Sequence, residues 1–403
     1  MLQTLPWLVA RPGHGKIRAR RHRCWWALKP MKPSTSILSP ESFNHIRPDV
    51  RAMQAYGVQD ARGMLKLDAM ENPHRLARSL QDALGQRLGS VALNRYPGQS
   101  LIELHSALMR YAQVPSGYDL MLGNGSDELI SLLALACAQP VTTGLPSRKS
   151  CVLAPLPGFV MYAMSAQLQG LDFVGVSLTA DFALDVPAMR DAIARHRPAL
   201  TYLAYPNNPS ANLWRDDAMQ AVIEAVGQHG GLVVIDEAYQ PFATRSYLDR
   251  LVQHPHVLLL RTLSKFGLAG VRLGYLIGPQ ALIAEFDKVR PPYNVSVLNC
   301  EAALFALEHQ AVFEAQAQDI RDQRAILFDS FSQLPGVQVF PSEANMILLR
   351  VPDAQHTFDR MKSRGVLIKN VSKMHPLLHN CLRLTVGTES ENRQMLAALR
   401  ASL

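Results

Sequence analysis

Lys265 is the one charged residue in LSKFGLAG, a run of mostly small and apolar residues at 263–270. It follows the apolar run HVLLLRT, which is typical of a buried strand. A lone lysine is most often a surface residue, but its flanks here are apolar and Thr262 and Ser264 add hydroxyl groups. A desolvated lysine has a lowered pKa, and its neutral amine can form a Schiff base with an aldehyde. Arg272, seven residues on, can bind a phosphate through two hydrogen bonds.

Two carboxylates end another apolar run, VVIDEAY at 233–239. We expect one of Asp236 and Glu237 to point inward, where a carboxylate must be paired because an isolated buried charge is very costly. Such a residue could bind Mg²⁺, but the chain has no phosphate-binding lysine motif to accompany it. It could instead pair with a protonated ring nitrogen, or cap a helix. Tyr239 follows three residues after Asp236.

Two further loops follow apolar runs in the same way. Asn208 lies in YPNNPSAN, which taken alone is a turn signal. In LMLGNGSDELISLLALA, a glycine turn leads to Ser126 and Asp127 at the start of an apolar helix. The free N–H groups of a helix N-terminus can bind an anion, although Ser and Asp are also common helix caps.

Each of these signals is ambiguous alone, and their joint occurrence after predicted strands is informative. Pyridoxal phosphate needs a lysine for its aldehyde, an acid for its ring nitrogen, and N–H and Arg donors for its phosphate. The sequence therefore predicts a pyridoxal phosphate site. We expect no metal, because no pattern of metal ligands accompanies it.

The elements that must position these residues alternate between strands and helices. The strands are apolar throughout, which is typical of a mostly parallel α/β sheet covered by helices on both faces. Ligands bind beyond the carboxyl ends of strands in such sheets. The predicted strands are 151–155, 171–177, 200–206, 231–237, 256–262 and 273–278, and the clearest helices between them are 186–196 and 216–230.

The C-terminal third has a different pattern. A long helical stretch at about 297–333 precedes two predicted strands, a helix around 354–364, two more strand segments and a closing helix. This order predicts a smaller α+β domain. We expect a basic, disordered extension at 1–40, an arm at 41–75 without a strand-helix unit, a large cofactor-binding domain at 76–296 and the small domain at 297–403.

A net charge of +8 would suggest a nucleic-acid partner, but most of the excess charge lies at the N-terminus. Residues 1–30 hold seven of the 41 Lys and Arg and no acid, which leaves 34 basic against 33 acidic residues, a net of +1. The segment could be a transit peptide, but a disordered extension or an early start before Met31 fits better, because serines are few. We expect neither a nucleic-acid nor a membrane partner. The alternative, a regulatory nucleic-acid-binding protein on a silent scaffold, conflicts with the full set of catalytic residue types.

The five cysteines include no CxxC pair and are odd in number, which favours a reducing, cytoplasmic location over a disulfide framework. The most apolar helical segment, LISLLALACA at 129–138, is too short to span a membrane and predicts a buried helix.

From about residue 40 to its end, the chain resembles the fold-type I pyridoxal-phosphate aminotransferases, and within them the group that acts on histidinol phosphate. The resemblance rests on LDAMENP (67–73), RYPG (95–98), GNGSDELI (123–130), YPNNPS (205–210), VIDEAY (234–239), RTLSKFGLAGVRLGY (261–275), PPYNVS (291–296) and CLRLTVGT (381–388).

The resemblance implies a role for each matching residue. Lys265 is the lysine that reacts with the aldehyde, and Asp236 holds the ring nitrogen. Asn208 and Tyr239 donate hydrogen bonds to the phenolic oxygen, and Phe159 stacks on the ring. The phosphate is held by Ser126, Asp127, Thr262, Ser264 and Arg272.

Substrate and partner residues are also implied. Arg383 matches the arginine that grips the glutamate carboxylate and the substrate phosphate, and Asn72 and Lys369 are further substrate contacts. Tyr96 matches a tyrosine that reaches the cofactor of a neighbouring subunit, which implies a homodimer with shared sites. The loop from Lys265 to Arg272 is one residue shorter than in many relatives, so we expect it to close differently.

The implied activity is transamination between L-histidinol phosphate and 2-oxoglutarate, giving imidazole-acetol phosphate and L-glutamate in histidine biosynthesis. The alternatives on the same scaffold are an aromatic or broad-specificity aminotransferase and an enzyme like threonine-phosphate decarboxylase.

Overall fold

The computed structural model describes residues 44–53, 57, 59–138 and 149–403. The predicted extension at 1–40, with Cys24, lies outside these residues. The chain divides into two units, 1–57 and 58–403. The described part of the first contains the short helix α1 (Pro48–Ala52), and the two-residue strand β1 (Leu65–Lys66) lies in the second.

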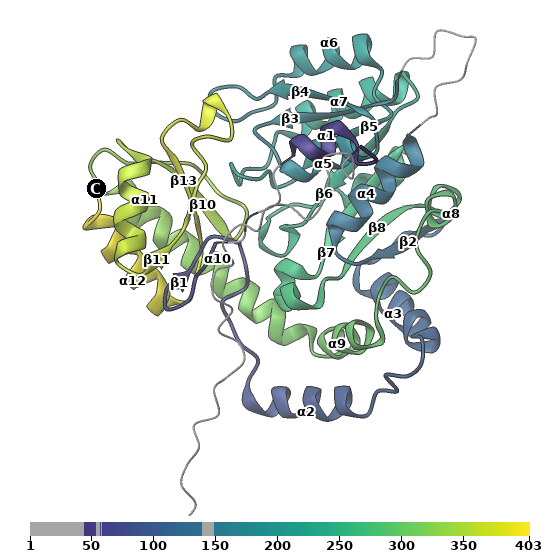
Figure 1. Ribbon diagram of the computed structural model, residues 1–403, viewed down its shortest axis with the longest axis horizontal. Helices are drawn as coiled ribbons and strands as arrows, with labels where there is room; N and C mark the ends of the chain where they lie inside the picture. Colours follow the sequence, from purple (N-terminus) through teal and green to yellow (C-terminus); the bar gives the residue numbers. More distant parts are fainter. Residues whose placement is uncertain (1–43, 54–56, 58, 139–148) are drawn as a thin grey trace, which may run out of the picture. The chain divides into compact units, whose positions relative to one another are not determined.

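The second unit is built on a seven-stranded sheet (Figure 1). Strand β8 runs antiparallel to both of its neighbours, and the other strands pair in parallel. The mostly parallel α/β sheet that the apolar runs predict is therefore confirmed. Its strands, in spatial order, are β2 (Tyr118–Gly123), β8 (Gly274–Pro279), β7 (Val257–Thr262), β6 (Leu232–Asp236), β5 (Leu200–Ala204), β3 (Cys151–Leu156) and β4 (Asp172–Ser177).

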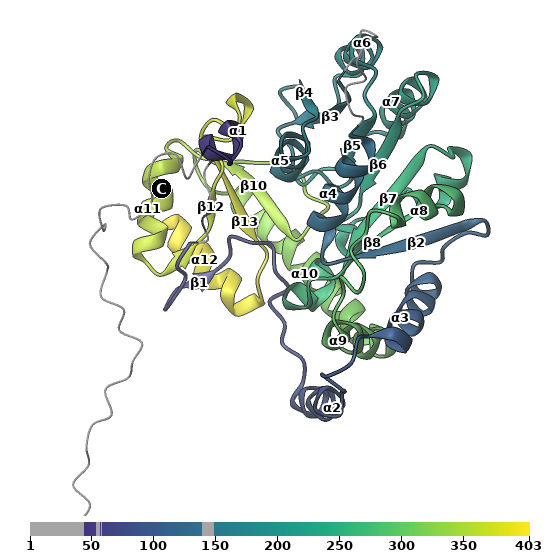
Figure 2. The ribbon, with the colours of Figure 1, turned by 45° about the vertical axis from the view of Figure 1, so that its right-hand side comes forward.

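Alternate residues of each central strand enter different apolar cores. In β7, Val257 and Leu259 belong to one core and Leu258 and Leu260 to another. Because successive side chains point to opposite faces, a strand covered on both sides must be apolar at every position. Figure 2 shows helices on both sides of the sheet. Helices α4 (Ser126–Cys137), α5 (Val160–Leu168) and α8 (Gln280–Asp287) build one core, and α3 (Gly98–Tyr111), α6 (Val186–His196), α7 (Asp216–Gln228) and α9 (Val297–Glu308) the other.

A second, four-stranded antiparallel sheet follows in the chain; most of its apolar residues form a core of their own, and Leu348 and Cys381 join a core of the large sheet. The helical stretch predicted at 297–333 is two helices, α9 and α10, which meet at His309. The remaining elements are α2 (Arg78–Gly89), α10 (Gln310–Ser332), β9 (Gln338–Val339), β10 (Met346–Arg350), α11 (Ala354–Ser363), β11 (Val366–Leu367), β12 (Lys369–Asn370), β13 (Cys381–Thr385) and α12 (Glu389–Arg400).

The loop after β7 closes tightly. It forms a π-helical turn, η4 (Ser264–Leu268), and a 3₁₀ turn, η5 (Ala269–Val271). Gly267 has a φ of 141°, and a Cβ there would lie 2.8 Å from the Phe313 ring. Arg272 itself takes a left-handed φ of 55°. The positive φ values of Gly267 and Arg272 turn the chain sharply, so that Arg272, seven residues after Lys265, returns to the sheet.

Within the described part of the chain, no helix combines the length and apolar character needed to cross a membrane. Cys137, Cys151, Cys300 and Cys381 carry free thiols, and all but Cys137 are buried.

Candidate active site

A cavity of about 110 Å³ opens at the edge of the sheet where β5, β6 and β7 end. Loops from separate parts of the chain meet there because the carboxyl ends of parallel strands share one edge. Most of the predicted cofactor residues line it. They are Ser126, Asp127, Phe159, Asn208, Asp236, Tyr239, Thr262, Ser264, Lys265 and Arg272, joined by Met70, Tyr162, Ala204, Pro206 and Ala238.

Lys265 reaches this cavity from η4. Its Nζ donates a hydrogen bond to the carbonyl of Ala69 at 3.2 Å and lies 5.8 Å from the ring centroid of Tyr239. Burial lowers the pKa of Lys265 from its ordinary 10.5 to about 8, and the positive charge of Arg383 acts in the same direction. Lys265 therefore loses its proton far more readily than a surface lysine, as its apolar flanks predict.

Asp236 ends β6 and points into the cavity, whereas Glu237 points to the opposite side. Asp236 Oδ2 accepts a hydrogen bond from the Tyr162 hydroxyl at 2.7 Å, and Oδ1 accepts one from the Ala238 N–H at 3.0 Å. Burial raises the pKa of Asp236 to about 6, and these two donors oppose the rise. The expected inward-pointing acid is thus Asp236.

Glu237 belongs to a buried ion pair behind the site. Its carboxylate lies 2.8 Å from Arg261 Nη2, accepts the Arg261 Nε–H at 3.0 Å and accepts the Tyr247 N–H at 2.6 Å. Neither charged group is exposed beyond 7%. The pair ties β6 to β7 just before the loops that carry the site, so Glu237 is structural rather than a second acid in the cavity.

Asn208, Tyr239 and Arg383 form a chain of hydrogen bonds. The Asn208 amide donates to the Tyr239 hydroxyl at 3.1 Å, and its Oδ1 accepts from Arg383 Nη1 at 2.8 Å. Burial raises the pKa of Tyr239 above its ordinary range, so its hydroxyl keeps its proton. Arg383 comes from β13 of the smaller sheet and also donates to the Asp68 carbonyl at 2.9 Å.

The N-terminus of α4 lies at the other end of the cavity. Gly125 precedes it with a φ of 85°, and no side chain caps the helix. A Cβ on Gly125 would lie 2.7 Å from Arg272 Nη2, whose guanidinium also pairs with Asp127 Oδ2 at 3.0 Å. Uncapped helix N–H groups beside an arginine favour the anion-site interpretation over the capped-helix one.

Some predicted residues lie outside the cavity lining. Tyr96 is 77% exposed and stacks on Tyr293, with ring centroids 4.4 Å apart. The Asn72 amide donates to the Phe266 carbonyl at 3.2 Å and so supports the residue next to Lys265. Lys369 is the strand partner of Arg383 in the smaller sheet.

Tyr162 and Met70 line the cavity but were not predicted from the sequence. Tyr162 lies three residues after Phe159 in PGFVMY, so the signal was an aromatic one helical turn from the stacking ring. Met70 has a left-handed φ of 53°, which no feature of its sequence indicates.

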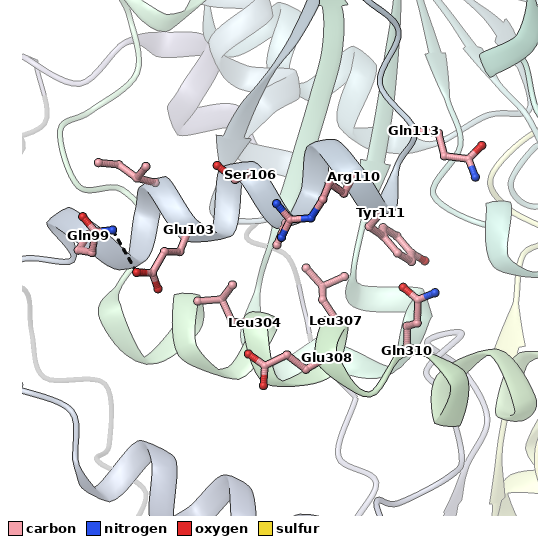
Figure 3. Close-up of a pocket in the computed structure, with 12 residues that line it drawn as sticks. Gln99, Glu103, Ser106, Arg110, Tyr111, Gln113, Leu304, Leu307, Glu308 and Gln310 are labelled. Atoms are coloured by element: carbon pink, nitrogen blue, oxygen red, sulfur yellow. Dashed lines mark hydrogen bonds between the residues drawn. The ribbon is translucent and has the colours of Figure 1, made fainter.

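A larger cavity, of about 660 Å³, lies between α3 and α9 (Figure 3). Gln99 and Glu103 on α3 are hydrogen-bonded to each other at 3.1 Å, and Leu304 and Leu307 of α9 line the opposite side, Leu307 near Arg110 and Tyr111. Among the described residues that line it there is no lysine, and none of its carboxylates is buried as Asp236 is. Volume therefore does not identify the chemical site in this protein, whereas the convergent polar groups around Lys265 do.

Comparisons with known proteins agree with this geometry. The family described as "Aminotransferase class I and II" matches residues 62–399. A relative from Polaromonas naphthalenivorans, named histidinol-phosphate aminotransferase, is 65% identical over 93% of this chain and 100% of its own length. One of the same name from Methylibium petroleiphilum is 65% identical over 91% of this chain and 96% of its own.

A solved structure shares the fold. It is the histidinol-phosphate aminotransferase of Sinorhizobium meliloti in complex with pyridoxal 5′-phosphate, with a TM-score of 0.76 and 24% identity over 90% of this chain and 99% of that one. The family match covers most of the chain, and the relatives are similar along nearly their whole length. The chain belongs to the aminotransferase class I and II family.

Proposed function

We propose that this chain uses pyridoxal phosphate to transfer an amino group between L-histidinol phosphate and 2-oxoglutarate, giving imidazole-acetol phosphate and L-glutamate, a step of histidine biosynthesis. The observation that carries the proposal is Arg383, which is buried and bonded to Asn208 beside Lys265. A planar cation there suits the carboxylate of glutamate and the phosphate of histidinol phosphate alike. The relatives at 65% identity support the same substrate.

The residues of the cavity fit pyridoxal phosphate. When bound, this cofactor supplies an aldehyde that captures amines and a ring that withdraws negative charge from the substrate Cα. Lys265 would hold the aldehyde and Asp236 the ring nitrogen, and Gly125 leaves room for the phosphate next to Arg272. The remaining contacts would be Phe159 on the ring face, Asn208 and Tyr239 at the phenolic oxygen, and Ser126, Asp127, Thr262 and Ser264 around the phosphate.

Lys265 would also move the proton that transamination requires. With a pKa of about 8, part of the Nζ amine is neutral near neutral pH, so Nζ could accept the proton from the substrate Cα and pass it on to the cofactor's C4′. The carboxylate of Asp236, at the end of β6, would pair with the ring nitrogen and keep that nitrogen protonated. The Tyr239 hydroxyl, which keeps its own proton, would donate toward the phenolic oxygen.

Substitution of Lys265 tests the site. Lys265→Ala should abolish turnover and the absorbance of the lysine-bound cofactor. A variant that stays yellow and active would refute the assignment of Lys265.

A substrate panel tests the specificity. With glutamate as donor, reaction with imidazole-acetol phosphate should exceed reaction with aromatic 2-oxo acids such as phenylpyruvate. A preference for the aromatic acids would favour the broad-specificity alternative. Release of CO₂ without need for 2-oxoglutarate would favour the decarboxylase alternative.

The proposed active unit is a homodimer with shared sites, located in the cytoplasm. Tyr96 and Tyr293 stack on each other with exposed rings, and Leu93, Ile102 and Leu298 are exposed apolar residues of the same two chain regions. A second copy could cover them and bring Tyr96 to its cofactor. The proposed division is a large part at 76–296, a small part at 297–403 and an arm at 41–75. The core that the smaller sheet shares with α10 and α12 supports a separate small part, although α9 packs in a core of the large sheet.

A further inference from the structure

Tyr162 donates its hydroxyl to the carboxylate of Asp236 at 2.7 Å. It lies on α5, lines the same cavity and is only 2% exposed. The Ala238 N–H binds the other oxygen, Oδ1. Each oxygen of the carboxylate therefore has one fixed donor within the chain, and Tyr162 supplies the only side-chain donor to it among the described residues.

The ring of Tyr162 is held on two sides. It stacks on Tyr202 of β5 with a centroid distance of 4.3 Å and an interplanar angle of 9°. Phe159 packs edge-on against it at 5.6 Å and 85°. A ring clamped in this way cannot turn its hydroxyl away from Asp236 without disturbing both neighbours. Tyr162 thus links the residue assigned to the cofactor's ring face with the residue assigned to its ring nitrogen.

The charge state of the pair follows from its surroundings. Burial raises the pKa of Tyr162 well above its ordinary range, so the hydroxyl stays neutral and donates. A donor to a carboxylate stabilises the ionised form over the protonated one. Without this donor, the buried Asp236 would compete more strongly for the proton that it shares with any partner nitrogen.

We propose that Tyr162 is a positioning residue for the transamination: its hydroxyl keeps Asp236 ionised and oriented, so that the proton stays on the ring nitrogen of the cofactor. This inference rests on the proposed role of Asp236. A merely structural Tyr162 would fill space between Phe159 and Tyr202, and phenylalanine would serve equally well.

The test compares Tyr162→Phe with Tyr202→Phe. Tyr202 is its stacking partner, and the Tyr202 hydroxyl lies 3.5 Å from the Ile130 carbonyl rather than at Asp236. Each holoenzyme is reconstituted with pyridoxal phosphate labelled with ¹⁵N in the ring, and the nitrogen chemical shift is measured at neutral pH. The Tyr162→Phe resonance should move toward that of a neutral pyridine, and the Tyr202→Phe resonance should stay at the wild-type position.

Steady-state rates give a second readout. We expect kcat of Tyr162→Phe to fall roughly tenfold, in line with loss of one hydrogen bond to a charged group, and KM to change little. Incorporation of 3-fluorotyrosine at position 162 preserves the packing and strengthens the donor, so the nitrogen resonance should move the opposite way. This substitution keeps the proposal testable if Tyr162→Phe does not fold.

The outcomes separate this inference from the role of Asp236. Asp236→Asn should shift the nitrogen resonance to the neutral position. If it does so while Tyr162→Phe and the fluorotyrosine variant match wild type, the role of Tyr162 is refuted and that of Asp236 stands. Equal shifts in Tyr162→Phe and Tyr202→Phe would also refute it, since packing would then explain both. An unshifted Asp236→Asn resonance would refute the proposed role of Asp236 together with the inference.

Discussion

Replacing Lys265 with methionine should stabilise the cofactor-free protein while it destroys activity. The lysine is held where its charge is poorly solvated, and its pKa falls from 10.5 to about 8. Methionine fills a similar volume without a charge. The substitution therefore removes a cost that the folded protein bears in order to keep a reactive amine.

The size of this cost follows from the pKa. A base whose pKa is lower in the folded state is destabilising at every pH below the folded pKa, and the penalty disappears as pH rises to the unfolded value. Each unit of pKa corresponds to about 1.4 kcal/mol, so the charged Lys265 costs up to about 3 kcal/mol at pH 7. The protein around a buried charge relaxes to accommodate it, so the measured cost should lie somewhat below this limit.

Urea unfolding of the cofactor-free proteins measures this difference. The advantage of Lys265→Met over wild type should be largest at pH 7 and shrink by about 2–3 kcal/mol between pH 8 and pH 10.5. Lys288→Met is the matched control, because Lys288 is exposed and paired with Glu285. It should change the free energy of unfolding by less than about 0.5 kcal/mol at any pH. An advantage of Lys265→Met that does not vary with pH would refute the desolvation argument.

Four further substitutions test neighbouring parts of the site. Asp236→Asn should raise the free energy of unfolding of the cofactor-free protein above pH 6 by up to about 3 kcal/mol, because an acid with a raised pKa costs stability above that pKa; the gain should vanish below about pH 4 in urea titrations. Glu237→Gln should cost about 3–5 kcal/mol, because it leaves Arg261 buried without a charged partner; an unchanged urea midpoint would contradict the ion-pair argument. Arg383→Lys should raise KM for 2-oxoglutarate roughly tenfold to a hundredfold, since Lys lacks the planar pair of donors; an unaltered KM would exclude a direct contact with the carboxylate. If sites are shared, coexpressed Tyr96→Ala and Lys265→Ala chains should form mixed dimers with more activity than the two parents together; activity no higher than their sum would contradict a shared site.

The cofactor loops could be predicted from sequence because their signal is local. Each apolar strand marks its own end, and parallel strands bring their carboxyl ends to one edge. Asn208 and Lys265 follow β5 and β7, and Asp236 ends β6, so their meeting could be predicted without long-range information. The sequence left Asp236 and Glu237 equivalent, however. Strand alternation sends them to opposite faces, and which face holds the cavity depends on the loops packed above it.

Tyr162 illustrates a contact that sequence could not provide. It is 74 residues from Asp236 in the chain, and its hydroxyl reaches the carboxylate only because α5 lies on the face of the sheet from which Asp236 projects. Tyr202 is equally buried and equally aromatic, yet its hydroxyl goes elsewhere. Residue type does not distinguish the two tyrosines, and the spacing of Tyr162 from Phe159 places it near the ring face without naming Asp236 as its partner; the packing of α5 supplies that contact.

The contribution of segment 68–72 was the hardest to predict from the sequence, because this segment acts largely through its backbone. The carbonyls of Asp68 and Ala69 accept hydrogen bonds from Arg383 and Lys265, and the Met70 N–H donates to Thr385 Oγ1. Backbone groups are present in every residue, so no residue type marks these positions. The same short stretch therefore fixes both Arg383, on strand β13 of the smaller sheet, and Lys265, on the turn η4 that follows β7 of the larger sheet. Met70 lines the cavity in a left-handed conformation that the surrounding contacts must maintain, whereas Arg383 lies behind the lining and reaches it through Asn208.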